Sequence, residues 1–267
     1  MRVIARRGHG TSAARTCVAR TAPALLAALA VVAGGCGGDT SAPAQTTPPA
    51  SLPQGAEPVR LDPANFTTAV DNPYMPLRPG SVWVYRDVEA DGARGRDVVR
   101  VLRRTKVIAG VRALVVRDRA TRGSRLIEDT QDWFAQDRAG NVWYLGEATQ
   151  AYTNGRPSST AGSWEAGVRG AQAGVLMPAH PAAGLQYRQE YRRGTAEDHA
   201  RVLSIDDQVQ SPFGHFSPAV LTKEFSRLEP NDLEYKLYAK GVGLVAAIGV
   251  SGDLSREVLV SYRKGGG

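Results

Sequence analysis

The chain has 267 residues, of which 42% are hydrophobic and 22% charged. This composition is that of a globular protein and excludes a disordered, collagenous or disulfide-rich class. The formal net charge is +7, but the first 35 residues hold five arginines and no acid, so the remaining chain carries 7 − 5 = +2. There, basic and acidic residues alternate, as in Arg96-Asp97 and Arg117-Asp118-Arg119. The alternation favours a solvated mixed surface over a nucleic-acid-binding stripe.

The first 36 residues predict an export signal. A basic start precedes the apolar run Leu25–Gly35, which ends at Cys36, and this order is typical of a signal peptide. A cysteine at the junction is typical of a bacterial lipoprotein, in which the thiol is diacylated and becomes the new N-terminus. About eleven apolar residues are too few to span a bilayer, which needs about 20. We therefore expect a lipid anchor at Cys36 on the extracytoplasmic face of the cell membrane. Plain secretion is the alternative, because Ala33 stands where lipoboxes usually carry Leu.

Three segments follow from this assignment. Residues 1–35 form the predicted lipoprotein signal peptide and contain Cys17, so Cys36 is the one thiol of the mature chain. Residues 36–58 are rich in Pro, Thr, Ser and Ala and predict a flexible tether. Residues 59–264 predict a single domain without a disulfide, which must be held together by its own core.

The elements of this domain are predicted from its start and turn signals. Asp62 before Pro63 suits an N-cap and the first helical position, so one short helix is expected. Turn signals then recur at a spacing of about ten residues, and Asn154-Gly155 is the strongest hairpin signal. The expected strands lie at 82–89, 96–106, 111–116, 125–137, 141–147, 185–192, 198–206, 218–227, 233–239, 243–250 and 256–262. The sequence predicts an all-β domain, an antiparallel meander of about ten to twelve strands forming a strongly curved sheet or open half-barrel.

Residues 157–183 interrupt the predicted meander. A glycine every few residues disfavours a helix or a long strand, and long irregular segments in compact domains are often functional. Trp164, Leu176 and Met177 indicate that the segment packs against the rest of the domain. We expect a long irregular loop that covers one face of the sheet as a lid.

Two adjacent segments carry a resemblance to a known family. They read Glu128-Asp129-Thr130-Gln131-Asp132-Trp133-Phe134-Ala135-Gln136-Asp137 and Gly140-Asn141-Val142-Trp143-Tyr144-Leu145-Gly146-Glu147. With Ser163-Trp164-Glu165-Ala166-Gly167, they make the chain resemble a family of uncharacterised secreted bacterial proteins and lipoproteins. The resemblance covers nearly the whole domain. It implies kinship and brings no known activity.

Acidic residues provide the first candidate site. Glu128 and Asp132 share one face of a strand, and Glu147 can join them across the turn. Paired carboxylates support acid–base catalysis when their environments separate their pKa values, and Glu190 offers another carboxylate near Asp198. Asp132, Glu147 and Glu190 are therefore candidate catalytic groups. Ion pairs between exposed carboxylates and the abundant arginines are the simpler interpretation.

Other kinds of chemistry find little support in the sequence. His180, His199 and His215 are scattered without the spacing of zinc ligands. There is no Gly-x-Ser-x-Gly motif, phosphate loop or dinucleotide fingerprint. We expect no metal, no cofactor and no nucleic-acid partner.

The tryptophans provide the second candidate site, because all four fall between residues 83 and 164. Such rings can stack on sugars or line a lipid cavity, although core packing explains them as well. The leading hypothesis is a non-enzymatic lipoprotein domain that binds an apolar or envelope-derived ligand (a lipid, a glycan or an envelope protein). Its site would lie in the concavity of the sheet, lined by Trp143, Tyr144, Trp164 and Met177. The alternatives are a carboxylate-based hydrolase acting on cell-wall glycan and a ligand-free interaction or scaffold module.

Overall fold

The computed structural model describes residues 51–266. The predicted signal peptide, Cys36 and most of the predicted tether lie outside the described residues. Among those described, no helix has the length and apolar character needed to cross a membrane. The elements are η1 (Pro63–Asn65), β1 (Phe66–Thr67), β2 (Val82–Val88), β3 (Arg94–Ile108), β4 (Val111–Arg122), β5 (Arg125–Asp137), β6 (Val142–Thr153), β7 (Arg156–Ser159), β8 (Trp164–Glu165), β9 (Gln172–Met177), β10 (Gln186–Arg188), β11 (Glu190–Tyr191), β12 (Asp198–Ser211), β13 (Gly214–Ser226), β14 (Leu233–Ala239), β15 (Gly243–Ser251) and β16 (Arg256–Arg263).

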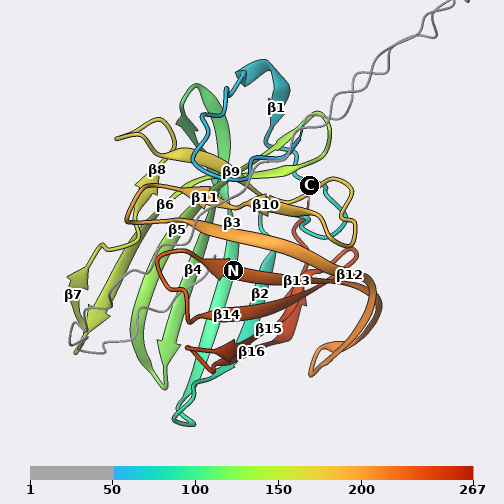
Figure 1. Cartoon of the computed structure of the whole chain (residues 1–267). Coiled ribbons are helices and arrows are strands. Elements are labelled where there is room, and N and C mark those ends of the chain that lie inside the picture. The colour runs from blue at the N-terminus through green and yellow to red at the C-terminus, as the bar shows by residue number, and fades with distance from the viewer. Residues whose placement is uncertain (1–50, 267) are drawn as a thin grey trace, which may run out of the picture. The chain divides into compact units, whose positions relative to one another are not determined.

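A single antiparallel sheet contains all of these strands (Figure 1). Hairpins connect β2 through β6 and β12 through β16, and β16 pairs with β2 to join the two meanders. The all-β antiparallel prediction is confirmed. The strand count exceeds the expected one because several strands have only two to four residues, too few to show a strand pattern in the sequence.

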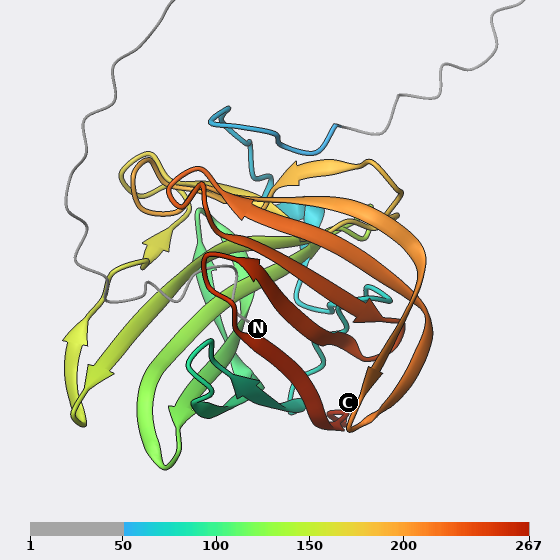
Figure 2. The same cartoon turned by 60° about the horizontal axis from the view of Figure 1, so that its bottom comes forward.

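Residues 186–191 close this sheet into a nearly complete barrel (Figure 2). β10 pairs with β12, whereas β11, which follows after the single residue Gln189, pairs with β9. Gly174 permits this crossing, because a Cβ atom there would overlap the backbone of Arg188 and Gln189. The predicted strongly curved sheet or half-barrel is therefore confirmed, and the sheet is nearly closed.

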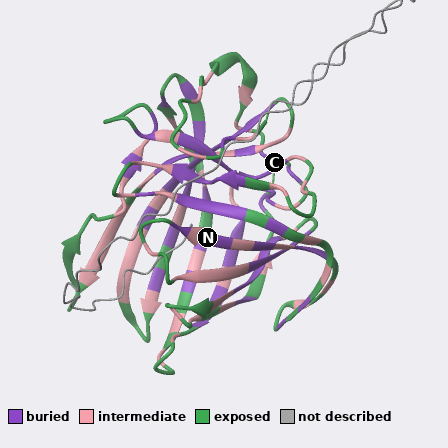
Figure 3. Ribbon diagram, viewed as in Figure 1, coloured by how far each residue is buried: buried purple, intermediate pink, exposed green. Residues whose placement is uncertain are grey.

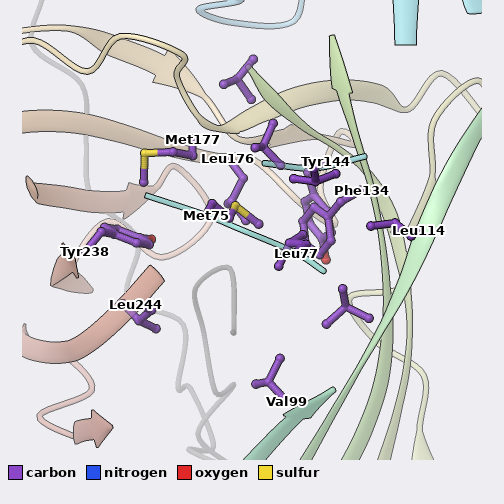
Figure 4. Packing of buried hydrophobic residues seen from close by; sticks show 14 of the residues in the cluster. Met75, Leu77, Val99, Leu114, Phe134, Tyr144, Leu176, Met177, Tyr238 and Leu244 are labelled. Atoms are coloured by element: carbon purple, nitrogen blue, oxygen red, sulfur yellow. The ribbon is translucent and has the colours of Figure 1, made fainter. Parts of the chain in front are cut away.

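The core lies inside this barrel. Buried and more exposed residues alternate along parts of β2 and β3, and Figure 3 shows how burial varies along the strands. The segment between β1 and β2 folds back on itself through a bridge between Val70 and Leu77. It places Met75 and Leu77 in the middle of the core, between Phe134 on one side and Tyr238 on the other (Figure 4).

The start of the domain differs from the expectation in one respect. The short helix is present as one turn of 3-10 helix, in which Asp62 Oδ1 accepts a hydrogen bond from the Ala64 N–H at 3.0 Å. The folded unit, however, begins at Leu52 and not at residue 59. Arg188 donates to the carbonyl oxygens of Gly55 and Glu57 and holds residues 52–58 against the barrel. The local sequence gives no sign of this contact, because its partner lies more than 100 residues away.

The segment 157–183 is more regular than the expected loop. It contains most of β7 and all of β8 and β9, and each of the three pairs with β6. Val175 and Met177 are buried in β9, where they lie in register with Trp143 and Val142. Apolar residues that can join a sheet edge outweigh the glycines here, so β9 is part of the wall. Residues 160–163, 166–171 and 178–185 remain irregular.

Candidate functional site

Period-two alternation sorts the charges of this barrel by sign. In Arg86-Asp87, Arg96-Asp97 and Arg117-Asp118-Arg119, each aspartate is buried on the inner face and each arginine points outward. This follows from strand geometry, because neighbouring side chains point to opposite faces. The inner face also carries most of the acids that the sequence analysis singled out. We refer to Asp132, Glu147, Glu190, Asp198 and Glu224 as the inner acidic cluster.

The cluster begins with two carboxyl groups that meet at one phenol. Tyr144 Oη lies 2.7 Å from Asp132 Oδ1 and 3.1 Å from Glu147 Oε2. A phenol has one proton to donate, so both contacts are hydrogen bonds only if one carboxyl group is protonated. Burial raises the pKa of Asp132 to about 7. Burial, and then the charge of Asp132, also raises the pKa of Glu147.

A second carboxyl pair lies next to the first. Glu190, in the closing strand β11, hydrogen-bonds to Asp198 at the start of β12, and Trp164 Nε1 donates to Glu190 Oε2 at 2.6 Å. Two carboxyl groups form such a bond only when one of them is protonated. Burial raises the pKa of Glu190, and the charge of Asp198 raises it further. Burial also raises the pKa of Asp198 to about 7.

Two aromatic rings connect the pairs. Tyr144 and Trp164 meet edge to face, with their centroids 5.4 Å apart. Trp164 in β8 is the direct cross-strand partner of Glu147 in β6. The arrangement places both carboxyl pairs along one aromatic wall.

A buried lysine marks the other end of the cluster. Lys236 Nζ lies 2.8 Å from a carboxylate oxygen of Glu224 and 3.1 Å from one of Glu234. Burial lowers the pKa of Lys236, but the charges of Glu224 and Glu234 outweigh that effect and raise the pKa above its ordinary value. Arg188, the other buried cation of the described chain, is bound to backbone carbonyl groups. The inner acidic cluster therefore has more acids than nearby cations.

Two further polar side chains are buried at this level of the barrel. The Tyr187 hydroxyl is fully buried without a hydrogen-bond partner, and Glu224 is close enough to raise its pKa in addition to the effect of burial. Neither polar atom of the Gln189 side chain has a partner. Such groups are costly unless water or a ligand satisfies them.

The residues proposed to line an apolar pocket do not lie on one surface. Tyr144 and Trp164 lie together on the inner face, and Met177 is buried in the core. Trp143 lies on the opposite face of β6, where it contacts Phe66 and its Nε1 donates to a carboxylate oxygen of Asp137. The structure has an apolar hollow about the size of one water molecule, but other residues line it, among them Met75, Trp83 and Leu244.

The sequence analysis identified part of the acidic cluster. It named Asp132, Glu147 and Glu190, and it placed Asp198 near Glu190. It did not identify Glu224 and Lys236, although each alternates with neighbouring residues in a way that places its side chain on the inner face of its strand. His199 faces away and contacts the carbonyl oxygen of Gln54 at 2.9 Å. No group of three or more His, Cys, Asp or Glu side chains within residues 51–266 is arranged to hold a metal ion.

Comparisons with known proteins give two structural similarities. No family profile and no curated protein sequence matches the chain. A protein of Bacteroides fragilis described as exported, with a YmcC-like fold, is 14% identical with a TM-score of 0.43, covering 72% of this chain and 99% of that one. A protein of Parabacteroides distasonis described as a lipoprotein is 12% identical with a TM-score of 0.39, covering 71% and 98%. Neither similarity bears on the chemistry of the inner acidic cluster.

Proposed function

We propose that the protein is an extracytoplasmic lipoprotein whose barrel binds a cationic ligand at its inner acidic cluster. Export and the lipid anchor rest on the N-terminal signal and Cys36. The binding function rests mainly on one observation, the two buried carboxyl pairs: Asp132 and Glu147 at the Tyr144 hydroxyl, and Glu190 beside Asp198.

Buried carboxylates need a compensating positive charge. Burial without enough counter-charge raises the pKa of an acid, and burial is the main cause of the raised pKa of Asp132 and of Asp198. An amine or guanidinium group placed between the pairs would replace those protons and form charge-assisted hydrogen bonds. Tyr144 and Trp164 add aromatic surface that attracts cations. The ligand whose charge complements these groups is an organic cation, and the Tyr187 hydroxyl near Glu224 offers it a further polar partner.

This proposal changes the expected class of ligand. The sequence suggested an apolar or envelope-derived ligand in a site lined mainly by aromatic side chains. Two of those side chains, Tyr144 and Trp164, use their polar atoms to bind carboxyl groups of the cluster. An envelope-derived ligand with an amine remains compatible with this geometry, whereas a purely apolar one would leave the acids without partners.

The test is calorimetric titration of the chain from residue 36 onward with spermidine. At about pH 8 we expect binding with release of protons, and at about pH 5.5 at least tenfold weaker binding, because the cluster then holds its protons. The double variant Asp132→Asn/Glu190→Gln should lose binding. Asp129→Asn is the matched control, since Asp129 pairs with Arg117 and Arg119 on the outer face. Binding that survives the double variant, or that does not weaken at the lower pH, would contradict the proposal.

A second function is favoured by one specific feature. Asp132 and Glu147 share a phenol and have raised pKa values, which are properties of a general acid and its partner carboxylate in glycan hydrolysis. If the protein is such a hydrolase, it releases reducing sugar from peptidoglycan, and Asp132→Asn lowers kcat by about 100-fold or more. Absence of turnover by the wild-type protein would exclude this alternative.

A further inference from the structure

The outer face of β2, β3, β4 and β16 carries a contiguous set of arginines. We define the outer arginine patch as Arg86, Arg96, Arg100, Arg117, Arg119 and Arg263. The strand register places them side by side: Arg86 faces Arg96, Arg100 faces Arg117, and Val82 alone separates Arg100 from Arg263. Five of the six are exposed, and Arg117 keeps 42% of its side chain accessible.

The patch contains two cross-strand pairs of like charge. Arg86 with Arg96 and Arg100 with Arg117 stand directly opposite each other in the ladder. Like charges in this position destabilise a sheet. Folding alone therefore does not account for them, whereas an anionic partner would turn this repulsion into attraction.

The protein itself supplies little counter-charge. Asp129 pairs with both Arg117 and Arg119. No acid within residues 51–266 forms an ion pair with Arg86, Arg96 or Arg100. The neighbouring aspartates of the same strands cannot serve, because alternation buries them on the inner face.

We infer that the outer arginine patch docks the domain on an anionic phospholipid surface. The inference rests on the proposed lipid anchor for its setting. Cys36 precedes the first docked residue, Leu52, by 16 positions, and a fully extended segment of that length spans about 50 Å. A globular unit of this size is about 45 Å across, so the tether is as long as the domain is wide and leaves several of its faces able to meet the membrane. Phosphate headgroups match the fork geometry of clustered guanidinium groups.

The experiment measures vesicle binding of the chain from residue 36 onward, with Cys36→Ser to prevent lipidation. All described strands and the described core lie within residues 52–266, which this chain contains in full. Vesicles of phosphatidylcholine, with and without about one third phosphatidylglycerol, are sedimented at about 0.1 M and about 0.5 M salt. The patch variant is Arg86→Gln/Arg96→Gln/Arg100→Gln. The control, Arg193→Gln/Arg201→Gln/Arg227→Gln, removes the same charge from exposed positions elsewhere.

We expect binding to the anionic vesicles only, and its loss at the higher salt concentration. The patch variant should bind about 100-fold more weakly, since each arginine near an anionic surface contributes about a factor of five. The loss of vesicle affinity in the control variant should be less than about a tenth of the loss in the patch variant. Equal losses in both variants, equal binding to neutral vesicles, or no binding of the parent protein would overturn the inference. Spermidine titration of the same variants should be unchanged, which separates this result from a failure of the proposed ligand site.

Discussion

Replacing Asp132 by asparagine tests whether the inner acidic cluster opposes folding at neutral pH. Burial raises the pKa of Asp132 from 3.8 to about 7. Between these values the folded protein binds this proton and the unfolded chain does not. The free energy of unfolding therefore decreases as the pH rises from about 4 to about 7, and becomes constant above that range. Asparagine has nearly the same shape, still accepts the Tyr144 hydroxyl and never ionises.

The expected size of the effect follows from the change in pKa. A rise of about three units in the pKa of Asp132 corresponds to a loss of about 4 kcal/mol at most in the free energy of unfolding, and electrostatic coupling to Glu147 reduces this loss. At about pH 8 we expect Asp132→Asn to be more stable than the wild type by about 2 to 4 kcal/mol, and at about pH 4 to differ by less than about 1 kcal/mol.

The assay is urea unfolding followed by tryptophan fluorescence at several pH values between about 4 and 8. Asp129→Asn is the control, because it removes an outer-face carboxylate whose pairs with arginine contribute less than about 1 kcal/mol. If Asp132→Asn keeps the wild-type dependence of stability on pH, the reasoning about the carboxyl pair is refuted.

Three further single variants and one double variant probe the barrel. Gly174→Ala should lower the free energy of unfolding by about 2 to 4 kcal/mol, because the new Cβ overlaps the backbone of Gln189; an unchanged urea midpoint would show that the closing strand can move aside. Trp164→Phe removes the donor to a buried carboxyl group and should cost about 1 to 3 kcal/mol, measured by thermal unfolding, where an unchanged Tm would contradict the assigned hydrogen bond. Lys236→Met should cost about 3 to 5 kcal/mol, because Glu224 loses its buried counter-charge. Adding Glu224→Leu should recover more than half of that loss, and urea unfolding of both variants would show whether it does.

The all-β class and most strand positions could be predicted from local patterns. Turn residues such as Asn154-Gly155 mark the hairpins, and period-two alternation marks the strands between them. The same alternation contained the charge separation, since Arg86-Asp87 and Arg96-Asp97 must send their side chains to opposite faces. The sequence analysis counted those charges together and inferred a mixed surface, so it missed a consequence that strand geometry already implied.

Other features depended on contacts between distant residues. The pairing of Glu190 with Asp198 requires β10 and β11, on either side of Gln189, to pair with opposite edges of the sheet. Gly174, which permits this crossing, lies in a third strand, β9. The docking of residues 52–58 depends on Arg188 in the same way.

Within regular stretches of strand, the face that a side chain occupies follows from the alternation of neighbouring residues along the backbone and can be read from the sequence. Which faces meet depends on the closure of the sheet. Closure of the sheet placed Asp132, Glu190 and Glu224 inside the barrel and left Arg100 on the outside. The physical reason is that closure depends on hydrogen-bond registers between strands far apart in the chain, which no local pattern specifies.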